Sequence, residues 1–171
     1  GTLALSDARL ADPRWDLLFT DVRGLTRFSD GGFYTEDLQV QFEGQPAVFN
    51  LVVGSDTDDP ALAARASLQG EFPADSLLAR HEPLAWLRPY LQGRGRWDIQ
   101  VDVPATAPGP PAPASRLRVE SDLAGVAITL PAPLAKTADA SLPLRLDAPL
   151  PVSGGEVQLR LGELLRLRGR A

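Results

Sequence analysis

The side chains that could do chemistry in this chain are few and scattered. His81 is the only histidine, the chain has no cysteine, and no Gly-x-Ser-x-Gly turn or other nucleophile signature accompanies the histidine. Acid–base or nucleophilic catalysis needs a base held by a partner near a nucleophile. We therefore expect a structural role for His81, on a short helix beside Leu78 and Glu82, and no enzymatic activity.

Two further patterns are similar to binding motifs but lack the residues that would complete them. Asp56, Asp58 and Asp59 suggest calcium, yet the glycine at the turn and the glutamate at the last ligand position are missing. The glycines and arginines of residues 93–96 precede an expected strand, whereas a phosphate-binding loop precedes a helix. We expect a solvated hairpin tip and the start of a strand, with no metal and no cofactor.

Basic residues gather near the C-terminus. Arg160, Arg166, Arg168 and Arg170 share one face, and alternation with leucines favours a solvated strand face. Contact with anionic lipid headgroups is the alternative. The chain of 171 residues has a net charge of −5, and a nucleic-acid-binding protein needs a concentrated basic face. The sequence therefore predicts no nucleic-acid partner.

The elements that would position these groups are mainly strands. Apolar and polar residues alternate with the period of two that is typical of a strand with one apolar side. Tyr34 is expected on the face of Leu38, and Leu159 and Leu161 are expected opposite Leu167 and Leu165. The inward-facing residues that could line an apolar groove are Leu38, Val40, Phe42, Phe49, Leu51, Val53, Leu68, Trp97, Ile99, Val101, Leu117, Val119 and Ile128.

Turns and breaks divide the strands. The pattern predicts a bend near Arg23 and Gly24, and Asp30-Gly31-Gly32 predicts a hairpin turn. One or two short helices are expected in an insert near 73–92, where Pro89 must shorten or kink the second. A Pro-rich loop is expected near 104–115, exposed and extended. No apolar run approaches the ~20 residues of a membrane-spanning helix.

Two architectures suit this pattern. One is a closed β-sandwich whose two sheets bury their apolar faces against each other. The other is a long curved antiparallel sheet whose apolar side stays partly open. The chain begins with glycine and contains no methionine, so we expect residues 1–171 to be an internal segment of a larger protein.

Several ordered phrases resemble the YhdP-type AsmA-like family. Residues 22–28 (VRGLTRF) resemble its recurrent strand pair, and residues 68–71 (LQGE) before 77–80 (LLAR) resemble its strand-to-helix step. Gly93, Gly95 and Trp97 resemble its next strand. The most specific phrase is residues 130–136 (LPAPLAK), whereas the Pro-rich loop matches no pattern of the family.

The resemblance implies a fold and a function. The fold would be a β-taco, or repeating β-groove, in a protein anchored in the inner membrane of Gram-negative bacteria and extending through the periplasm. The function would be conduction of phospholipid toward the outer membrane, with acyl chains and other segments of the same full-length chain as partners. The rival function is an envelope scaffold or interaction module built on the closed sandwich.

Overall fold

The fold is given by a computed structural model that describes residues 1–13, 17–79, 82–106, 113–151 and 155–170. Strands dominate it, with two short helical segments between the fifth and sixth strands. In chain order the elements are β1 (Thr2–Asp12), β2 (Leu17–Phe28), β3 (Gly32–Phe42), β4 (Gln45–Gly54), β5 (Leu62–Pro73), α1 (Ala74–Ala79), the 3₁₀ helix η1 (Glu82–Tyr90), β6 (Leu91–Pro104), β7 (Ser115–Ser121), β8 (Val126–Ile128), β9 (Leu144–Leu150), β10 (Glu156–Leu161) and β11 (Leu165–Arg170).

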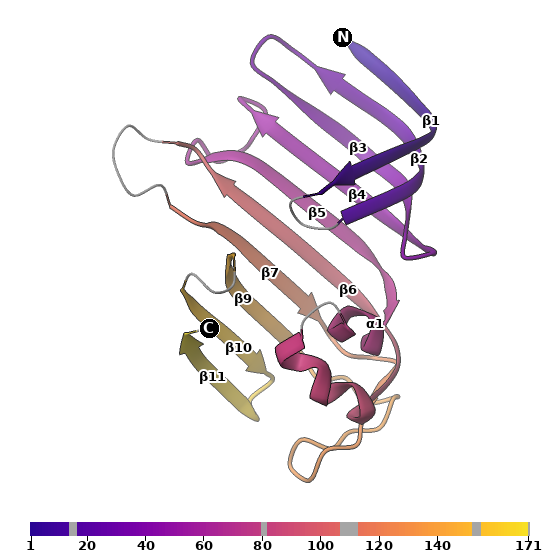
Figure 1. Ribbon diagram of the computed structural model, residues 1–171, viewed down its shortest axis with the longest axis vertical. Helices are drawn as coiled ribbons and strands as arrows, with labels where there is room; N and C mark the ends of the chain where they lie inside the picture. The colour runs from indigo at the N-terminus through magenta and orange to yellow at the C-terminus, as the bar shows by residue number, and fades with distance from the viewer. Residues whose placement is uncertain (14–16, 80–81, 107–112, 152–154, 171) are drawn as a thin grey trace.

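The strands form one open antiparallel sheet, and their order follows the chain (Figure 1). The sheet has 11 strands, with β8 off the main path and paired with the first residues of β6. Because hairpins link most neighbours, strand order is set by short connections. The expected long curved sheet is confirmed, and the closed sandwich is ruled out because the described strands belong to this open sheet.

The register between strands places the apolar residues of each strand beside those of its neighbours across the whole sheet. Residues directly opposite one another in an antiparallel pair share a face. One apolar row therefore crosses eight strands, and a second row lies beside it; together they define the apolar face. The first row is Leu38, Phe49, Leu68, Ile99, Val119, Leu146, Leu159 and Leu167, and the second is Leu51, Ala66, Val101, Leu117 and Ala148.

Bulges bend the first three strands at matching places. Asp7, Asp21 and Asp37 all have positive φ, at 51°, 50° and 42°, a conformation that aspartate tolerates better than most residues. The Asp37 N–H donates to Asn50 Oδ1 at 2.8 Å, and Asn50 Nδ2 donates to Asp37 Oδ1 at 2.9 Å. The Asn50 side chain thus satisfies the backbone that the bulge frees. The bend expected near Gly24 is confirmed, with register shifts on both sides of Arg23.

The bulge at Asp37 also corrects one expectation. It places one extra residue of β3 between Tyr34 and Leu38, so the face of each residue before it is reversed. Tyr34 lies opposite Val52, on the polar face of the sheet, and Phe33 lies opposite Val53 on the apolar face. The expectation that Tyr34 shares the face of Leu38 is therefore wrong.

The position of the Phe19 ring shows that the sheet is curved at β2. Its ring lies 4.8 Å from that of Phe49 and 5.5 Å from that of Phe42. Because β2 and β4 are separated by β3, they would lie roughly 9.5 Å apart in a flat sheet. The bent end of β2 has therefore folded toward the apolar face, where the Phe19 ring packs against those of Phe42 and Phe49.

The helical insert covers one end of the apolar face (Figure 1). β5 ends at Pro73, and α1 begins at Ala74, which is 1% exposed. Trp97 Nε1 donates to the carbonyl oxygen of Phe72 at 3.2 Å, joining β6 to the end of β5 just before the helix. Pro89 lies inside η1, which is a 3₁₀ helix rather than a regular α-helix. His81 lies outside the described residues.

The segment 122–143 closes the same end. Leu123 and Val126 are completely buried, and β8 pairs with the first residues of β6. Lys136 Nζ donates to the carbonyl oxygens of Leu123, Val126 and Thr137 at 2.9, 2.5 and 2.9 Å. Burial lowers the pKa of Lys136, partly opposed by nearby carboxylates. Lys136, the last residue of the phrase 130–136, therefore holds the segment 122–143 together through these hydrogen bonds.

Candidate functional site

The thirteen residues expected to line a groove fall into two groups. Seven are at most 7% exposed and belong to the core near the helices. In that core the Phe42 ring meets the Phe72 ring edge-on at 5.6 Å. The seven are Leu38, Val40, Phe42, Phe49, Leu68, Trp97 and Ile128. Because these side chains already pack against other protein atoms, they offer almost no surface to a ligand.

The remaining six are partly exposed. Ile99 and Val119 lie in the middle of the first apolar row, and the other four lie in the strand halves remote from α1 and η1. The six are Leu51, Val53, Ile99, Val101, Leu117 and Val119. Their main-chain groups are paired in the sheet, so what they offer a partner is aliphatic side-chain surface alone. These six residues are the candidate site, and the part of the apolar face that they form is called the open half.

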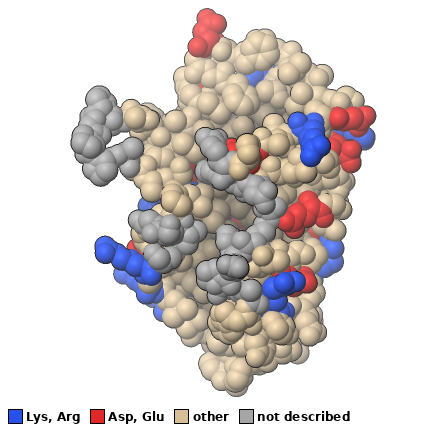
Figure 2. Space-filling view, in the orientation of Figure 1, with Lys and Arg blue, Asp and Glu red and all other residues tan. Residues whose placement is uncertain are grey.

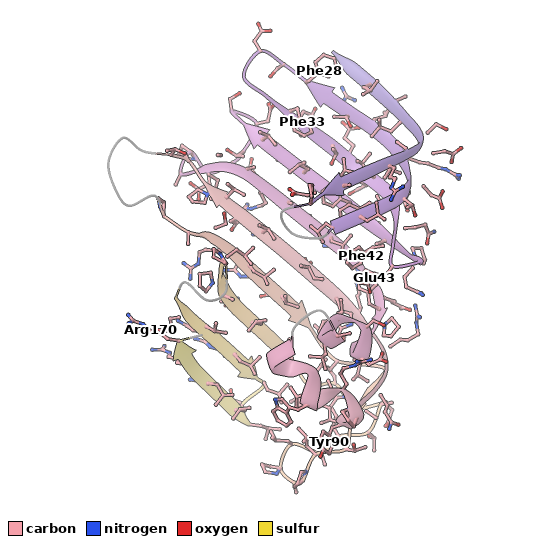
Figure 3. All side chains as sticks on the ribbon, viewed as in Figure 1. Phe28, Phe33, Phe42, Glu43, Tyr90 and Arg170 are labelled. Carbon is pink, nitrogen blue, oxygen red and sulfur yellow. The ribbon has the colours of Figure 1, made fainter. Side chains whose placement is uncertain are left out.

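The residues expected to line the groove omit several members of the same face. Ala66 lies between Leu51 and Val101, and Leu146 continues the first row beyond Val119. Phe28, opposite Phe33 at the far rim, is 52% exposed (Figure 3). Alternation within β5 and β9 carries the signal for Ala66 and Leu146, whereas the Phe33–Phe28 pair depends on the bulge, which the sequence alone did not locate.

Charge is excluded from the two apolar rows. Their thirteen members are Leu, Ile, Val, Phe and Ala. In Figure 2, the acidic and basic side chains that are coloured lie mostly toward the sides of the face seen there. Apolar residues that remain partly exposed over several adjacent strands are unusual in a soluble domain and mark a contact surface.

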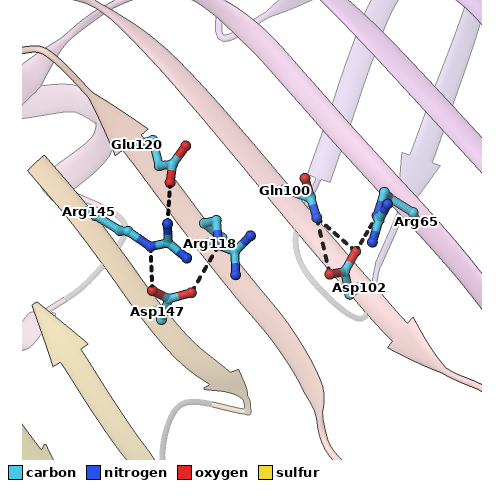
Figure 4. Close-up of polar contacts among 7 residues, drawn as sticks. All are labelled: Arg65, Gln100, Asp102, Arg118, Glu120, Arg145 and Asp147. Atoms are coloured by element: carbon cyan, nitrogen blue, oxygen red, sulfur yellow. Dashed lines mark hydrogen bonds and ion pairs between the residues drawn. The ribbon is translucent and has the colours of Figure 1, made fainter. Parts of the chain in front are cut away.

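Arginines and carboxylates pair across strands on the opposite, polar face (Figure 4). Arg65 Nε lies 2.7 Å from Asp102 Oδ1, and Arg118 Nε lies 3.0 Å from Asp147 Oδ1. Arg145 contacts both Asp147, at 2.9 Å, and Glu120, at 3.1 Å.

These pairs set the charge state of Asp147. Burial alone would raise the pKa of Asp147, but hydrogen bonds from Arg145 and Arg118 outweigh it and lower that pKa. The hydrogen bond to Asp147 likewise raises the pKa of Arg145. Exposed cross-strand pairs of this kind each contribute only modestly to stability. The polar face is thus a solvated outer surface, opposite in character to the open half.

Other candidate sites have ordinary structural explanations. The turn after β4 is closed by Thr57, whose Oγ1 donates to the carbonyl oxygen of Gly54 at 2.9 Å. Among the described residues, no group of three or more His, Cys, Asp or Glu could hold a metal ion. A hollow of about 520 Å³ on the polar face combines Arg96, Arg145 and Arg160 with Asp98, Glu120 and Asp122. This mixture of both charges selects no simple ion.

Comparison with known proteins identifies the family. In the part of the chain that the structure describes, no helix is long and apolar enough to cross a membrane. Searches among curated proteins and solved structures gave no significant match. The family model described as YhdP protein matches residues 1–171, which is the whole sequence. This match agrees with the phrases at 22–28 and 130–136, and the chain therefore belongs to the YhdP protein family.

Proposed function

We propose that the open half of the apolar face contacts the acyl chains of phospholipids, and that the protein is a periplasmic part of a conduit between the inner and outer membranes of a Gram-negative bacterium. Membership of the YhdP family supports this function. The observation that carries it is the partly exposed part of the first apolar row, which crosses five strands without a polar residue: Ile99, Val119, Leu146, Leu159 and Leu167.

The dimensions of the row suit an acyl chain. The five strands that carry these residues lie about 4.8 Å apart and together span roughly 19 Å. The hydrocarbon core of a bilayer is about 30 Å thick and contains two opposed layers, so one layer of acyl chains occupies about 15 Å. The row is therefore longer than one acyl chain, and a chain lying along it can move from strand to strand over a surface of one kind.

The energetics suit transport better than storage. Each CH₂ group removed from water contributes about 0.8 kcal/mol, so full enclosure of a long chain would stabilise it by on the order of 10 kcal/mol. A partly exposed face removes only part of the chain from water. It also has no polar group in its two rows to hold a fixed position. Both features favour weak, sliding contact, and the function needs no cofactor and no catalytic step.

The rest of the assembly follows from this proposal. An inner-membrane anchor and the neighbouring stretches of the conduit would come from other segments of the full-length chain. The headgroup would remain in water at the side of the face, because the apolar rows offer it no partner. Which phospholipid travels would then depend more on supply than on recognition by this segment.

Native mass spectrometry with added phospholipid tests the proposal. The protein should carry phospholipid adducts, and a variant with aspartate at Val101 should lose most of them while remaining folded by circular dichroism. Ser67→Asp is the control, because Ser67 lies on the polar face of the neighbouring strand β5, directly opposite Gln100. Equal adducts on both variants, or none on the unmodified protein, would contradict acyl-chain contact at this face.

A further inference from the structure

A hollow of about 520 Å³ lies on the polar face of the sheet, where the segment 122–143 begins and ends. Four neighbouring strands, β6, β7, β9 and β10, bound it, and each contributes two polar-face positions within the strand or beside its end. A volume of this size is typical of a small-molecule site. The register joins four of these positions in one row: Asp98, Glu120, Arg145 and Arg160. The other four are Arg96, Asp122, Pro143 and Gly162.

The hollow forms because two of these positions carry little side chain. Pro143 and Gly162 are neighbours, and the Gly162 N–H donates to the Pro143 carbonyl oxygen at 2.7 Å. Gly162 has a positive φ of 50°, which glycine adopts without strain. Another wall is held by Ser121, whose Oγ donates to the carbonyl oxygen of Arg96 at 2.7 Å. Since these contacts exist without a ligand, binding would not have to order the walls.

Charge is sorted across the hollow. Carboxylates line its β6–β7 side and guanidinium groups line its β9–β10 side, with Arg96 on β6 as the exception. Where the two sides meet, Glu120 and Arg145 pair at 3.1 Å (Figure 4). A small inorganic anion would meet the carboxylates on one side, and a metal cation would meet the arginines on the other. A ligand that carries both charges would find a partner on each side.

Two groups of opposite charge in the hollow are left for a ligand. Arg160 lies directly opposite Arg145 on one side and Arg166 on the other, and like charges at opposite positions destabilise antiparallel strands. Among the described residues, Arg160 forms no ion pair that would offset this repulsion. Asp122 Oδ1 accepts a hydrogen bond from the Ala124 N–H at 3.0 Å, which leaves Asp122 Oδ2 for another donor. An anion at Arg160 and a cation at Asp122 would therefore each complete a contact.

We propose that this hollow binds a zwitterionic phosphate ester. Its phosphate would lie over Gly162 between Arg145 and Arg160, because guanidinium donors match the oxygens of a phosphate. Its ammonium would lie at Asp122, which is two strands from Gly162 in the order β7–β9–β10 and therefore roughly 10 Å away along the sheet. In a phosphoethanolamine group a two-carbon linker separates the two charges, so one molecule reaches both sides. The charges of an α-amino acid lie on groups bonded to one carbon, which is too close.

Two sources offer this chemistry. A water-soluble ester would enter the hollow from solvent, and the headgroup of a phospholipid in a membrane carries the same pair of charges. In neither case is the ligand a lipid whose chains lie on the apolar rows, because Arg145 and Arg160 belong to the opposite face of the sheet. The proposal therefore does not depend on whether the apolar face contacts acyl chains.

Isothermal titration calorimetry with two matched esters tests the proposal. The probe is glycerophosphoethanolamine, and the comparison is glycerophosphoglycerol, which has the same phosphodiester but hydroxyl groups in place of the ammonium. The variant Arg160→Gln removes the proposed phosphate partner, and Asp122→Asn removes the ammonium partner. Arg116→Gln is the control, because it removes an exposed arginine from the polar face of β7 outside the hollow. Circular dichroism should show that all three variants fold, since each changed residue is exposed.

The unmodified protein should bind the ethanolamine ester more tightly than the glycerol ester. Arg160→Gln should weaken both esters at least about tenfold, as expected when a charged hydrogen-bond partner is lost. Asp122→Asn should weaken the ethanolamine ester alone and so remove the preference, and Arg116→Gln should change neither. Equal binding of the two esters by the unmodified protein, or an equal loss in Arg116→Gln, would overturn the proposal.

Vesicles distinguish the two sources of the ligand. The protein is sedimented with phosphatidylcholine vesicles prepared with and without phosphatidylethanolamine. Sedimentation that requires phosphatidylethanolamine and is lost in Arg160→Gln and Asp122→Asn would identify a membrane headgroup as the ligand. Binding of the soluble ester without such sedimentation would identify a free ester. Binding of neither the ester nor the vesicles would overturn the proposal.

Discussion

Placing an aspartate at each of three consecutive residues of β5 distinguishes the buried and open halves of the apolar face. Leu68 is 6% exposed and lies between Phe49 and Ile99. Ala66 lies two residues earlier on the same face, partly exposed, between Leu51 and Val101. Ser67 lies between them in sequence and faces the polar side, opposite Asn50 and Gln100. One strand thus provides a buried site, an open site and a control.

The expected costs differ enough to be decisive. Leu68→Asp loses about 1.5–3 kcal/mol of leucine burial and adds several kcal/mol for an unpaired buried carboxylate. Together these approach the 5–15 kcal/mol by which a typical domain is stable, so this variant should not fold. At Ala66 the carboxylate remains hydrated, and the cost reduces to a strand preference of up to about 1 kcal/mol.

Thermal unfolding followed by circular dichroism measures the difference. Ala66→Asp should lower the Tm by about 2–4 °C, since 1 kcal/mol corresponds to such a shift in a protein of this size. Ser67→Asp should stay within a similar range. If Ala66→Asp were unfolded like Leu68→Asp, the face would be sealed along its whole length, and the reasoning that assigns an open half would be refuted.

Asn50→Asp, an obvious polar-face control for a variant of Leu51, is unsuitable because Asn50 Nδ2 donates to Asp37. An aspartate there would set two carboxylates together at the bulge. Ser67 has no such role in the described contacts, which is why the comparison is made on β5 instead of β4. The structure therefore favours Ser67→Asp over Asn50→Asp as the polar-face control.

Three further predictions concern the elements that hold the face. Asp37→Gly should be about 1 kcal/mol more stable to urea than Asp37→Ala, because glycine adopts the positive φ of 42° without a side-chain clash; equal stabilities would show that the bulge is unstrained. Lys136→Met leaves three carbonyl oxygens without their donor and should cost on the order of 2 kcal/mol; hydrogen exchange should then rise within 122–142, and exchange rising equally everywhere would contradict a local fastening. Asp147→Asn should make stability less sensitive to acid: the lowered pKa of Asp147 supplies stability that is present above the ordinary carboxyl value of about 4 and is lost as pH falls through the lowered pKa. Urea titrations at pH 7 and pH 3 measure the difference, and an unchanged acid dependence would contradict the role of Arg118 and Arg145.

Much of the fold is predictable because alternation is a local property. The rows through β4, β5 and β6 follow from residue types alone, and Asp30-Gly31-Gly32 correctly predicts the β2–β3 hairpin, whose Ser29 N–H donates to the Gly32 carbonyl oxygen at 2.9 Å. The pairing of Leu159 with Leu167 and of Leu161 with Leu165 is confirmed for the same reason. A short turn leaves each strand little choice of partner or register.

What escapes prediction depends on contacts between distant residues. Alternation places Tyr34 on the wrong face because the bulge at Asp37 is stabilised by Asn50, 13 positions away, and the pattern carries no sign of that contact. The division of the groove residues into buried and open halves likewise depends on where α1 and the 122–143 segment fold. The sequence predicts the face of Leu68 and of Val101 equally well. Only the assembled sheet shows that Leu68 is buried in the core and that Val101 is partly exposed.

Site-specific photocrosslinking to phospholipid tests the central claim most directly. A benzophenone amino acid is placed at Val101 in the open half, at Gln100 on the polar face and at Trp97 in the buried end, all on β6. Cells producing the full-length protein are irradiated, and phospholipid adducts are detected by mass spectrometry of the purified protein. Adducts at 101, with few at 100 and 97, are the result predicted here. Adducts at 100 equal to those at 101, or none at 101, would contradict a lipid path over the open half of the apolar face.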